Sequence, residues 1–158
     1  MTELKKGDIA PAFTLFDTDK KQVSLADYKG KNVVMLFFPL AYSSFCTEEL
    51  CSVRDTMHEY NDANAAVIGI SIDSLFVLDK FKKDEQLNFD LLSDFNKEVS
   101  NAYGVLYDVF PAFDYKGVSK RAAFVINTDG IVQYAEICPT PGHQPDFNAI
   151  VALLNAEY

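Results

Sequence analysis

The chain has 158 residues, the length of one domain, and we expect residues 1–158 to form a single domain with one substantial core. Hydrophobic residues make up 49% and charged residues 23%, which is typical of a globular protein rather than a disordered chain. The formal net charge of −9 argues against nucleic acid and anionic membranes as partners, because both select clustered Lys and Arg. No apolar run is long enough for a signal peptide or a membrane span, so we expect a cytoplasmic location.

The first half of the chain predicts a hairpin followed by a strand, a helix and a strand. Phe13–Phe16 and Gln22–Ser24 flank a polar turn, which is typical of a β-hairpin. Six consecutive apolar residues at Val33–Phe38 suit a central strand that is buried on both faces. Apolar residues three or four apart from Cys46 to about Asn61 predict an amphipathic helix, and Ala65–Ile72 predicts the next strand. This order implies parallel pairing of the two strands through a right-handed crossover.

The second half continues with alternating helices and strands, ending in a second hairpin and a helix. We expect, in order, a helix from Ser74 to about Gln86, a short strand at Leu91–Leu92, a helical turn near Lys97–Tyr103, strands at Arg121–Ile126 and Ile131–Ile137, and a helix from Pro145 to Glu157. Asn127–Gly130 is a turn of hairpin type. The fold class is therefore α/β, with a thioredoxin-like arrangement in which helices flank a central mixed sheet and a hairpin precedes it.

A cysteine stands where the first buried strand gives way to the first helix. Ser43 and Ser44 favour the N-cap position, so Cys46 is expected near the first turn of the helix. Free backbone N–H groups and the positive end of the helix dipole favour an anion there. Such positions can lower a thiol pKa from its usual value of about 8.5. We therefore expect a lowered pKa and a nucleophilic thiolate at Cys46.

The other cysteines and the histidines carry weaker signals. Three cysteines are too few for a disulfide framework. Cys138, which precedes Pro139 at the end of a strand, is expected to be structural. His58 and His143 lack any spacing to cysteine pairs that would indicate zinc, so neither a metal nor another cofactor is expected.

At the strand-to-helix junction the sequence resembles the peroxiredoxin family. The family pattern is Pro, three residues, Thr or Ser, two residues, Cys, and it reads here Pro39, Ser43 and Cys46. The family also uses an Arg on a later strand, where Arg121 stands. The sequence from Phe37 to Ala41 is most similar to that of the one-cysteine enzymes related to alkyl hydroperoxide reductase E. The pairing of Cys46 with a second cysteine, Cys51, instead resembles the bacterioferritin-comigratory-protein branch.

The resemblance implies a thiol peroxidase that reduces hydrogen peroxide or organic hydroperoxides through a Cys46 sulfenic acid. Arg121 is expected to stabilise the thiolate and to bind a peroxide oxygen, because its planar guanidinium offers several donors. Ser43 can hold the substrate by its hydroxyl, and Pro39 can shape and shield the loop. Glu49 matches a family Glu with a supporting role. An external thiol reductant such as a thioredoxin- or glutaredoxin-like protein, and a homodimer, are the expected partners.

The fate of the Cys46 sulfenic acid is left open by the sequence. Cys51 either resolves it as an intramolecular disulfide or packs in the helix while an external thiol attacks directly. Two other functions compete with the peroxidase: a thioredoxin-like thiol-disulfide oxidoreductase, and a redox-signalling or chaperone-like protein. Four residues separate Cys46 and Cys51, where oxidoreductases carry two, and this spacing disfavours the first of these.

Overall fold

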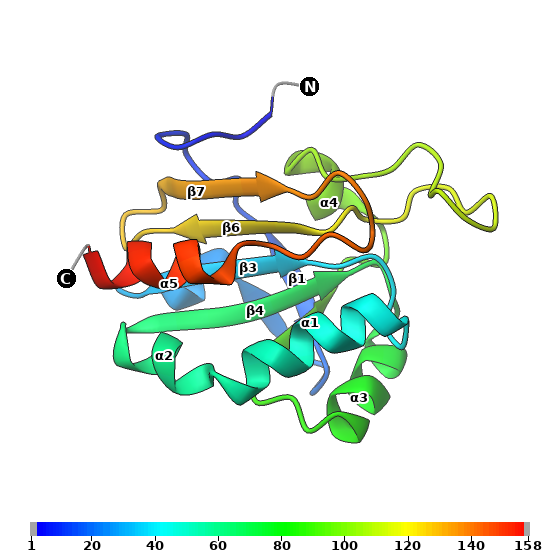
Figure 1. Ribbon diagram of the computed structural model, residues 1–158, viewed down its shortest axis with the longest axis horizontal. Helices are drawn as coiled ribbons and strands as arrows, with labels where there is room; N and C mark the ends of the chain where they lie inside the picture. The colour runs from blue at the N-terminus through cyan, green and yellow to red at the C-terminus, as the bar shows by residue number, and fades with distance from the viewer. Residues whose placement is uncertain (1–2, 157–158) are drawn as a thin grey trace.

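A seven-stranded mixed sheet forms the centre of the computed structural model, which describes residues 3–156 (Figure 1). The strands are β1 (Thr14–Asp17), β2 (Gln22–Ser24), β3 (Asn32–Phe37), β4 (Ala65–Ser71), β5 (Asp90–Ser93), β6 (Ala122–Ile126) and β7 (Val132–Ile137). Their order in the sheet is β2-β1-β5-β4-β3-β6-β7. β4 pairs in parallel with both β3 and β5. The other four pairs, β1–β2, β1–β5, β3–β6 and β6–β7, are antiparallel.

The helices are η1 (Leu25–Tyr28), α1 (Ser44–Asp55), α2 (Met57–Asp62), α3 (Leu75–Asp84), α4 (Glu98–Ala102) and α5 (Phe147–Ala156). α1, α2, α3 and α5 pack on one face of the sheet (Figure 1). α4 and the N-terminal segment around Phe13 cover the other face. β3 is buried at every position because it lies between these two layers, as its unbroken apolar run predicts.

Alternating residues of β3 supply both layers of the core. Val34 and Leu36 face α1 and α5, whereas Met35 and Phe37 face the layer that holds Tyr103. Phe37 and Tyr103 also pack against the ring of Phe124 on β6, with ring centroids 5.8 and 5.4 Å from it. The sheet is thus anchored at its centre by aromatic packing between β3, β6 and the α4 region.

Most predicted elements are confirmed, and the differences are local. The mixed sheet, its flanking helices and the N-terminal hairpin are present as expected. The single helix predicted from Cys46 to about Asn61 is instead two helices, which break at Thr56. The Thr56 hydroxyl donates to the carbonyl of Ser52, a local hydrogen bond that competes with helix continuation.

The element ends differ by a few residues. The 3-10 helix η1 was not predicted, and Arg121 lies one residue before β6 rather than on it. The last helix begins at Phe147, later than the predicted Pro145, and its predicted end at Glu157 lies outside the described residues. Within residues 3–156 no helix combines the length and apolar character needed to cross a membrane.

The aromatic cluster on β6 gives a test of the fold. Phe124→Ala should lower the free energy of unfolding by about 3–5 kcal/mol, because it leaves a cavity at a fully buried position. Urea denaturation followed by circular dichroism measures the loss. Phe95→Ala, at a residue 64% exposed, is the matched control and should change the same quantity by less than about 0.5 kcal/mol. Equal losses in the two variants would show that the core does not centre on β6.

Candidate active site

The loop between β3 and α1 is held by side chains from α3 and the end of β4. The backbone N–H of Ala41 donates to the carboxylate of Asp73 at 2.8 Å. The next residue, Tyr42, has a positive φ of 69°, a conformation that side chains other than Gly seldom adopt. Its hydroxyl donates to Asp84 at 2.7 Å and its ring packs 5.0 Å from that of Phe81. These contacts hold the loop in a conformation that the sequence pattern did not reveal.

Pro39 and Ser43 lie at the two ends of this loop. Pro39 is buried directly after β3, where the last sheet hydrogen bond is donated by the Phe38 N–H to Ile70, so its missing N–H leaves no donor unpaired. Ser43 is the N-cap residue of α1, but its hydroxyl donates to the Leu40 carbonyl at 2.8 Å rather than capping the helix. Its carbonyl accepts the N–H of Thr47. The exposed Ser43 hydroxyl therefore stays at the loop beside the helix start.

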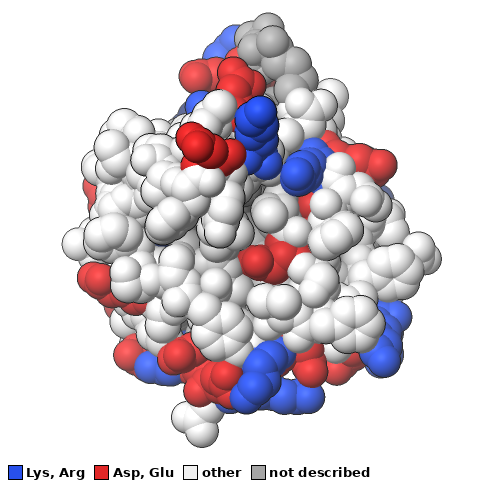
Figure 2. All heavy atoms as spheres, turned by 90° about the vertical axis from the view of Figure 1, so that its right-hand side faces the viewer, with Lys and Arg blue, Asp and Glu red and all other residues white. Residues whose placement is uncertain are grey.

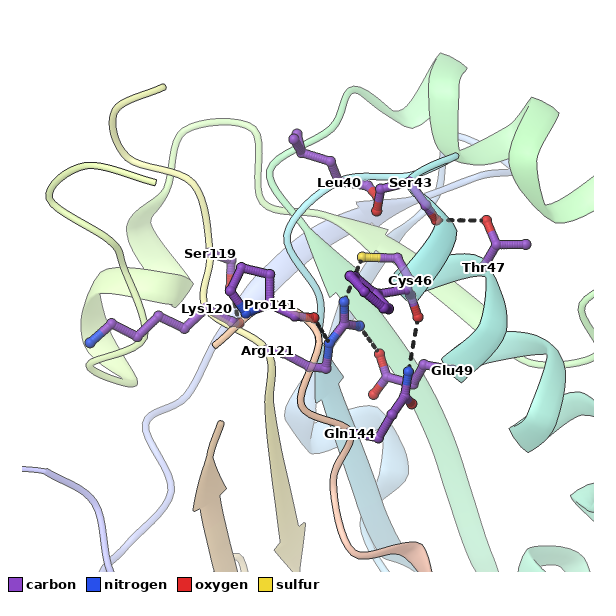
Figure 3. Close-up of polar contacts among 11 residues, drawn as sticks. Leu40, Ser43, Cys46, Thr47, Glu49, Ser119, Lys120, Arg121, Pro141 and Gln144 are labelled. Carbon is purple, nitrogen blue, oxygen red and sulfur yellow. Dashed lines mark hydrogen bonds and ion pairs between the residues drawn. The ribbon is translucent and has the colours of Figure 1, made fainter. Parts of the chain in front are cut away.

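Cys46 is in the first turn of α1 and is fully buried. The Arg121 Nη2 atom lies 3.2 Å from its sulfur and donates a hydrogen bond to it (Figure 3). The sheet explains this contact between residues 75 positions apart: Phe37 at the end of β3 pairs with Ala122 at the start of β6. Arg121 thus lies beside the loop that follows β3.

All three nitrogens of the Arg121 side chain have a partner, although Arg121 is only 1% exposed. Nη2 donates to Cys46, Nη1 to the carboxylate of Glu49 at 2.5 Å, and Nε to the Pro141 carbonyl at 3.0 Å (Figure 3). Glu49 lies one turn after Cys46 on the same face of α1. The guanidinium plane is therefore fixed by two acceptors while its third donor faces the sulfur.

The expected lowering of the Cys46 pKa is wrong for this structure, in which the sulfur is buried. Burial of the sulfur raises the pKa of the Cys46 thiol above its ordinary value, because the thiolate loses its hydration. Arg121, the Ser43 hydroxyl and the Leu40 backbone favour the thiolate and oppose this rise. The sequence indicated the favourable partners but not the completeness of burial.

Glu49 is more than a distant support. Its carboxylate is fully buried, and burial raises its pKa to about 7 although Arg121 acts in the opposite direction. Oε1 accepts from Arg121, whereas Oε2 has no hydrogen-bond partner among the described residues. The buried carboxylate of Glu49 therefore depends on the Arg121 guanidinium for its hydrogen bonding, and in turn it positions that guanidinium.

The sulfur atoms of the other two cysteines make none of the contacts with Arg121 described above, although Cys138 lies near Glu49 and Arg121. Cys51 is partly buried on α1, and its sulfur is 3.4 Å from the Glu85 carboxylate. Cys138 is buried just after β7. Burial and the nearby carboxylates of Glu136 and Glu49 raise the pKa of Cys138 to about 12, which makes it a poor nucleophile. All three cysteines are free thiols in this structure.

The segment after β7 completes the site, and no sequence motif indicated its role. The Pro141 carbonyl accepts from Arg121, and the Gln144 side chain donates to the Phe45 carbonyl at 3.1 Å (Figure 3). The ring of Phe45 packs against Gly142 so closely that an added Cβ would lie 3.2 Å from it. Contacts from backbone carbonyls and a glycine leave no recognisable residue pattern.

The end of the molecule that carries this loop is largely uncharged. Figure 2 shows this face as mainly white, with most charged side chains near its rim and a small acidic patch in the middle. Its loops expose apolar side chains, among them Tyr42, Phe45, Val109 and Phe113. Such a surface suits small neutral substrates better than anionic ones.

The chain matches known proteins over most of its length. Residues 6–135 match the family model described as AhpC/TSA family. The chain is 41% identical over 135 residues to peroxiredoxin Bcp of Escherichia coli K12, covering 85% of this chain and 86% of that protein. It is 39% identical over 132 residues to peroxiredoxin Q, chloroplastic, of Oryza sativa subsp. japonica, covering 84% of this chain and 58% of that protein.

Solved structures show the same fold. The crystal structure of peroxidoxin BcpB from Mycobacterium tuberculosis has a TM-score of 0.86 and 28% identity, and the match covers 99% of each chain. The thioredoxin-like fold expected from the sequence is therefore confirmed. Of the two branches that the sequence resembled, the relatives favour the bacterioferritin comigratory protein branch. The chain belongs to the AhpC/TSA family of peroxiredoxins and is a thiol peroxidase that reduces peroxides through a cysteine.

Proposed function

We propose that Cys46 is the peroxidatic nucleophile, which reduces hydrogen peroxide and organic hydroperoxides. The observation that carries this assignment is the 3.2 Å contact between the Arg121 guanidinium and the buried Cys46 sulfur at the start of a helix. Cys51 lies beside a carboxylate, and Cys138 has a pKa raised by burial and acidic neighbours. A carboxylate disfavours a nearby thiolate, so neither offers a comparable environment.

The reaction follows from the arrangement of these groups. The Cys46 thiolate attacks one peroxide oxygen, a sulfur–oxygen bond forms and the O–O bond breaks. The departing oxygen takes a proton and leaves as water or an alcohol, and the sulfur is left as a sulfenic acid. Negative charge passes from sulfur to the departing oxygen, and Arg121, already beside the sulfur, is positioned to stabilise it at both places.

Ser43 and Pro39 shape the approach to the sulfur. The exposed Ser43 hydroxyl lies at the loop next to Cys46 and can turn from the Leu40 carbonyl to a peroxide oxygen. Pro39 keeps the loop packed against the sheet without leaving an unpaired donor. Glu49 acts through Arg121, whose orientation it fixes, and does not touch the substrate.

For regeneration we propose that Cys51 condenses with the Cys46 sulfenic acid, releasing water, and that an external thiol reductant then reduces the disulfide. Both cysteines lie in the uninterrupted helix α1. Five residues of helix place their Cα atoms roughly 8.6 Å apart on nearly opposite faces. A disulfide tolerates at most about 7 Å. The start of α1 must therefore unwind, which costs far less than global unfolding.

We expect the partners to bind the face of the molecule that carries the loop between β3 and α1. A thioredoxin- or glutaredoxin-like protein would reach the exposed disulfide once α1 has unwound. We also propose a homodimer that covers part of the apolar loop surface around Phe45, Val109 and Phe113. The proposed location is the cytoplasm, where such reductants keep thiols reduced.

Replacement of the nucleophile tests the function. Cys46→Ser should abolish peroxide consumption in the presence of a thiol reductant, because a serine hydroxyl is not ionised at neutral pH. The assay follows hydrogen peroxide and an organic hydroperoxide over time. Cys138→Ser is the matched control and should retain activity. If Cys46→Ser still consumed peroxide at the wild-type rate, the reaction would belong to another cysteine, and a signalling or disulfide-exchange role for Cys46 would become the better account.

The guanidinium is tested by Arg121→Lys. The contacts with Cys46, Glu49 and Pro141 come from three separate nitrogens of the guanidinium, and the single nitrogen of an ammonium cannot take all three positions. The second-order rate constant with peroxide should therefore fall by about a hundredfold, the cost of losing one transition-state donor. Stopped-flow measurement of Cys46 oxidation gives this constant. Arg54→Lys, at a partly exposed arginine of the same helix, should leave it within about twofold. An unchanged constant in Arg121→Lys would remove Arg121 from the mechanism.

Resolution by Cys51 is tested by peptide mass mapping after one equivalent of peroxide. Wild-type protein should yield a Cys46–Cys51 link, and far-ultraviolet circular dichroism should show a loss of helix on oxidation. Cys51→Ser should instead accumulate a sulfenic acid that dimedone traps. A persistent, trappable sulfenic acid on wild-type protein with Cys51 still free would establish a one-cysteine mechanism.

A further inference from the structure

We propose that Glu136, Cys138 and His143 form a binding site for a divalent cation of the Zn²⁺ type, separate from the peroxidatic sulfur. The three side chains each offer one ligand atom, and these atoms all lie within 4.8 Å of one another. They come from β7 and the loop that follows it. Neither the reaction at Cys46 nor resolution by Cys51 uses any of them.

The spacing of the ligand atoms fits tetrahedral coordination. Zn²⁺ lies about 2.0–2.3 Å from nitrogen, oxygen and sulfur ligands, so two ligands of a tetrahedral ion are about 3.3–3.8 Å apart. The Nε2 atom of His143 and the Oε2 atom of Glu136 are 3.6 Å apart, inside this interval. The remaining separations, up to 4.8 Å, need a small inward turn, which the half-exposed His143 side chain is free to make.

Hydrogen bonds already orient the carboxylate as a ligand. Oε1 of Glu136 accepts from the Tyr134 hydroxyl at 2.7 Å and from the Asp146 backbone N–H at 2.9 Å. Oε2, the other oxygen, is the one that faces His143. Ligating carboxylates in metal sites are commonly held in this way by neighbouring donors. The carboxylate therefore loses little freedom when it binds a cation.

The backbone fixes the other two ligands. Glu136 and Cys138 are two positions apart along an extended segment, so their side chains point to the same side. The Cys138 N–H donates to the Arg121 carbonyl at 2.8 Å, which continues the β6–β7 pairing. The His143 N–H donates to the Thr140 carbonyl, and this turn brings the imidazole back toward the strand end. The backbone thus holds the three ligands near one another before a cation binds.

The donor set selects the cation. Binding of the cation displaces the proton of the Cys138 thiol. The resulting thiolate, a carboxylate and a neutral imidazole together neutralise a divalent charge, and sulfur with nitrogen donors favours Zn²⁺ over Mg²⁺ or Ca²⁺. Cys138 is buried at 2% exposure, whereas His143 is exposed, so the cation would enter from the solvent side and keep water as a fourth ligand. The usual zinc spacing of paired Cys or His residues is absent from these positions, because Glu136 on a strand takes the place of the second ligand of such a pair.

The site adjoins the reaction centre through the loop between its ligands. Pro141, between Cys138 and His143, supplies the carbonyl that accepts from Arg121 Nε. A bound cation would hold both ends of this loop and so stabilise the folded protein by mass action.

Titration of the reduced full-length protein with Zn²⁺ tests the proposal. Isothermal titration calorimetry uses a Cys46→Ser, Cys51→Ser background, so that Cys138 is the sole thiol. We expect one equivalent to bind, with affinity at least about tenfold weaker after Cys138→Ser or His143→Ala. His58→Ala, at the other histidine, is the matched control and should leave the affinity unchanged.

Co²⁺ in place of Zn²⁺ supplies an independent readout. A thiolate-to-cobalt charge-transfer band should appear in the Cys46→Ser, Cys51→Ser protein and disappear after Cys138→Ser. The proposal is overturned if this protein binds no Zn²⁺, if Cys138→Ser binds it as tightly, or if His58→Ala weakens binding as much as His143→Ala. These outcomes are independent of peroxidase activity, so the proposed function can stand or fall separately.

Discussion

The buried ion pair between Arg121 and Glu49 is the interaction on which the site depends. Both side chains are almost completely removed from solvent, and losing one partner of such a pair typically costs about 3–5 kcal/mol. The pair holds the guanidinium so that its remaining donor faces the Cys46 sulfur. The same arginine therefore pairs with Glu49 in the core and donates to the Cys46 sulfur.

The sheet brings these residues together from distant parts of the chain. Antiparallel pairing of β3 with β6 places the start of one strand beside the end of the other. Cys46 follows β3 through a short loop, and Arg121 immediately precedes β6. α1 then carries Glu49 one turn beyond Cys46. The same helix start would have to unwind to form the proposed disulfide between Cys46 and Cys51.

Sequence patterns predicted most of the elements and the residues that meet around Cys46, but not the burial of these residues. The apolar run of β3 and the spacing along α1 were sufficient to place Cys46 at a strand-to-helix junction. Complete burial of Cys46 could not be predicted from the sequence, because it depends on packing with residues from distant parts of the chain. Contacts such as Ala41 with Asp73, or Pro141 with Arg121, involve backbone atoms and leave no periodic signal.

We propose that Arg121 lowers the free-energy cost of ionising the buried Cys46 thiol. Burial alone raises the pKa of Cys46, and Arg121 is the first of the groups that oppose this rise. The most direct test is the pKa of Cys46, measured from thiolate absorbance against pH in protein whose other two cysteines are replaced by serine, with and without Arg121→Gln. The pKa of Cys46 should be clearly higher in the Arg121→Gln protein. An equal or lower pKa in that variant would show that Arg121 does not stabilise the Cys46 thiolate.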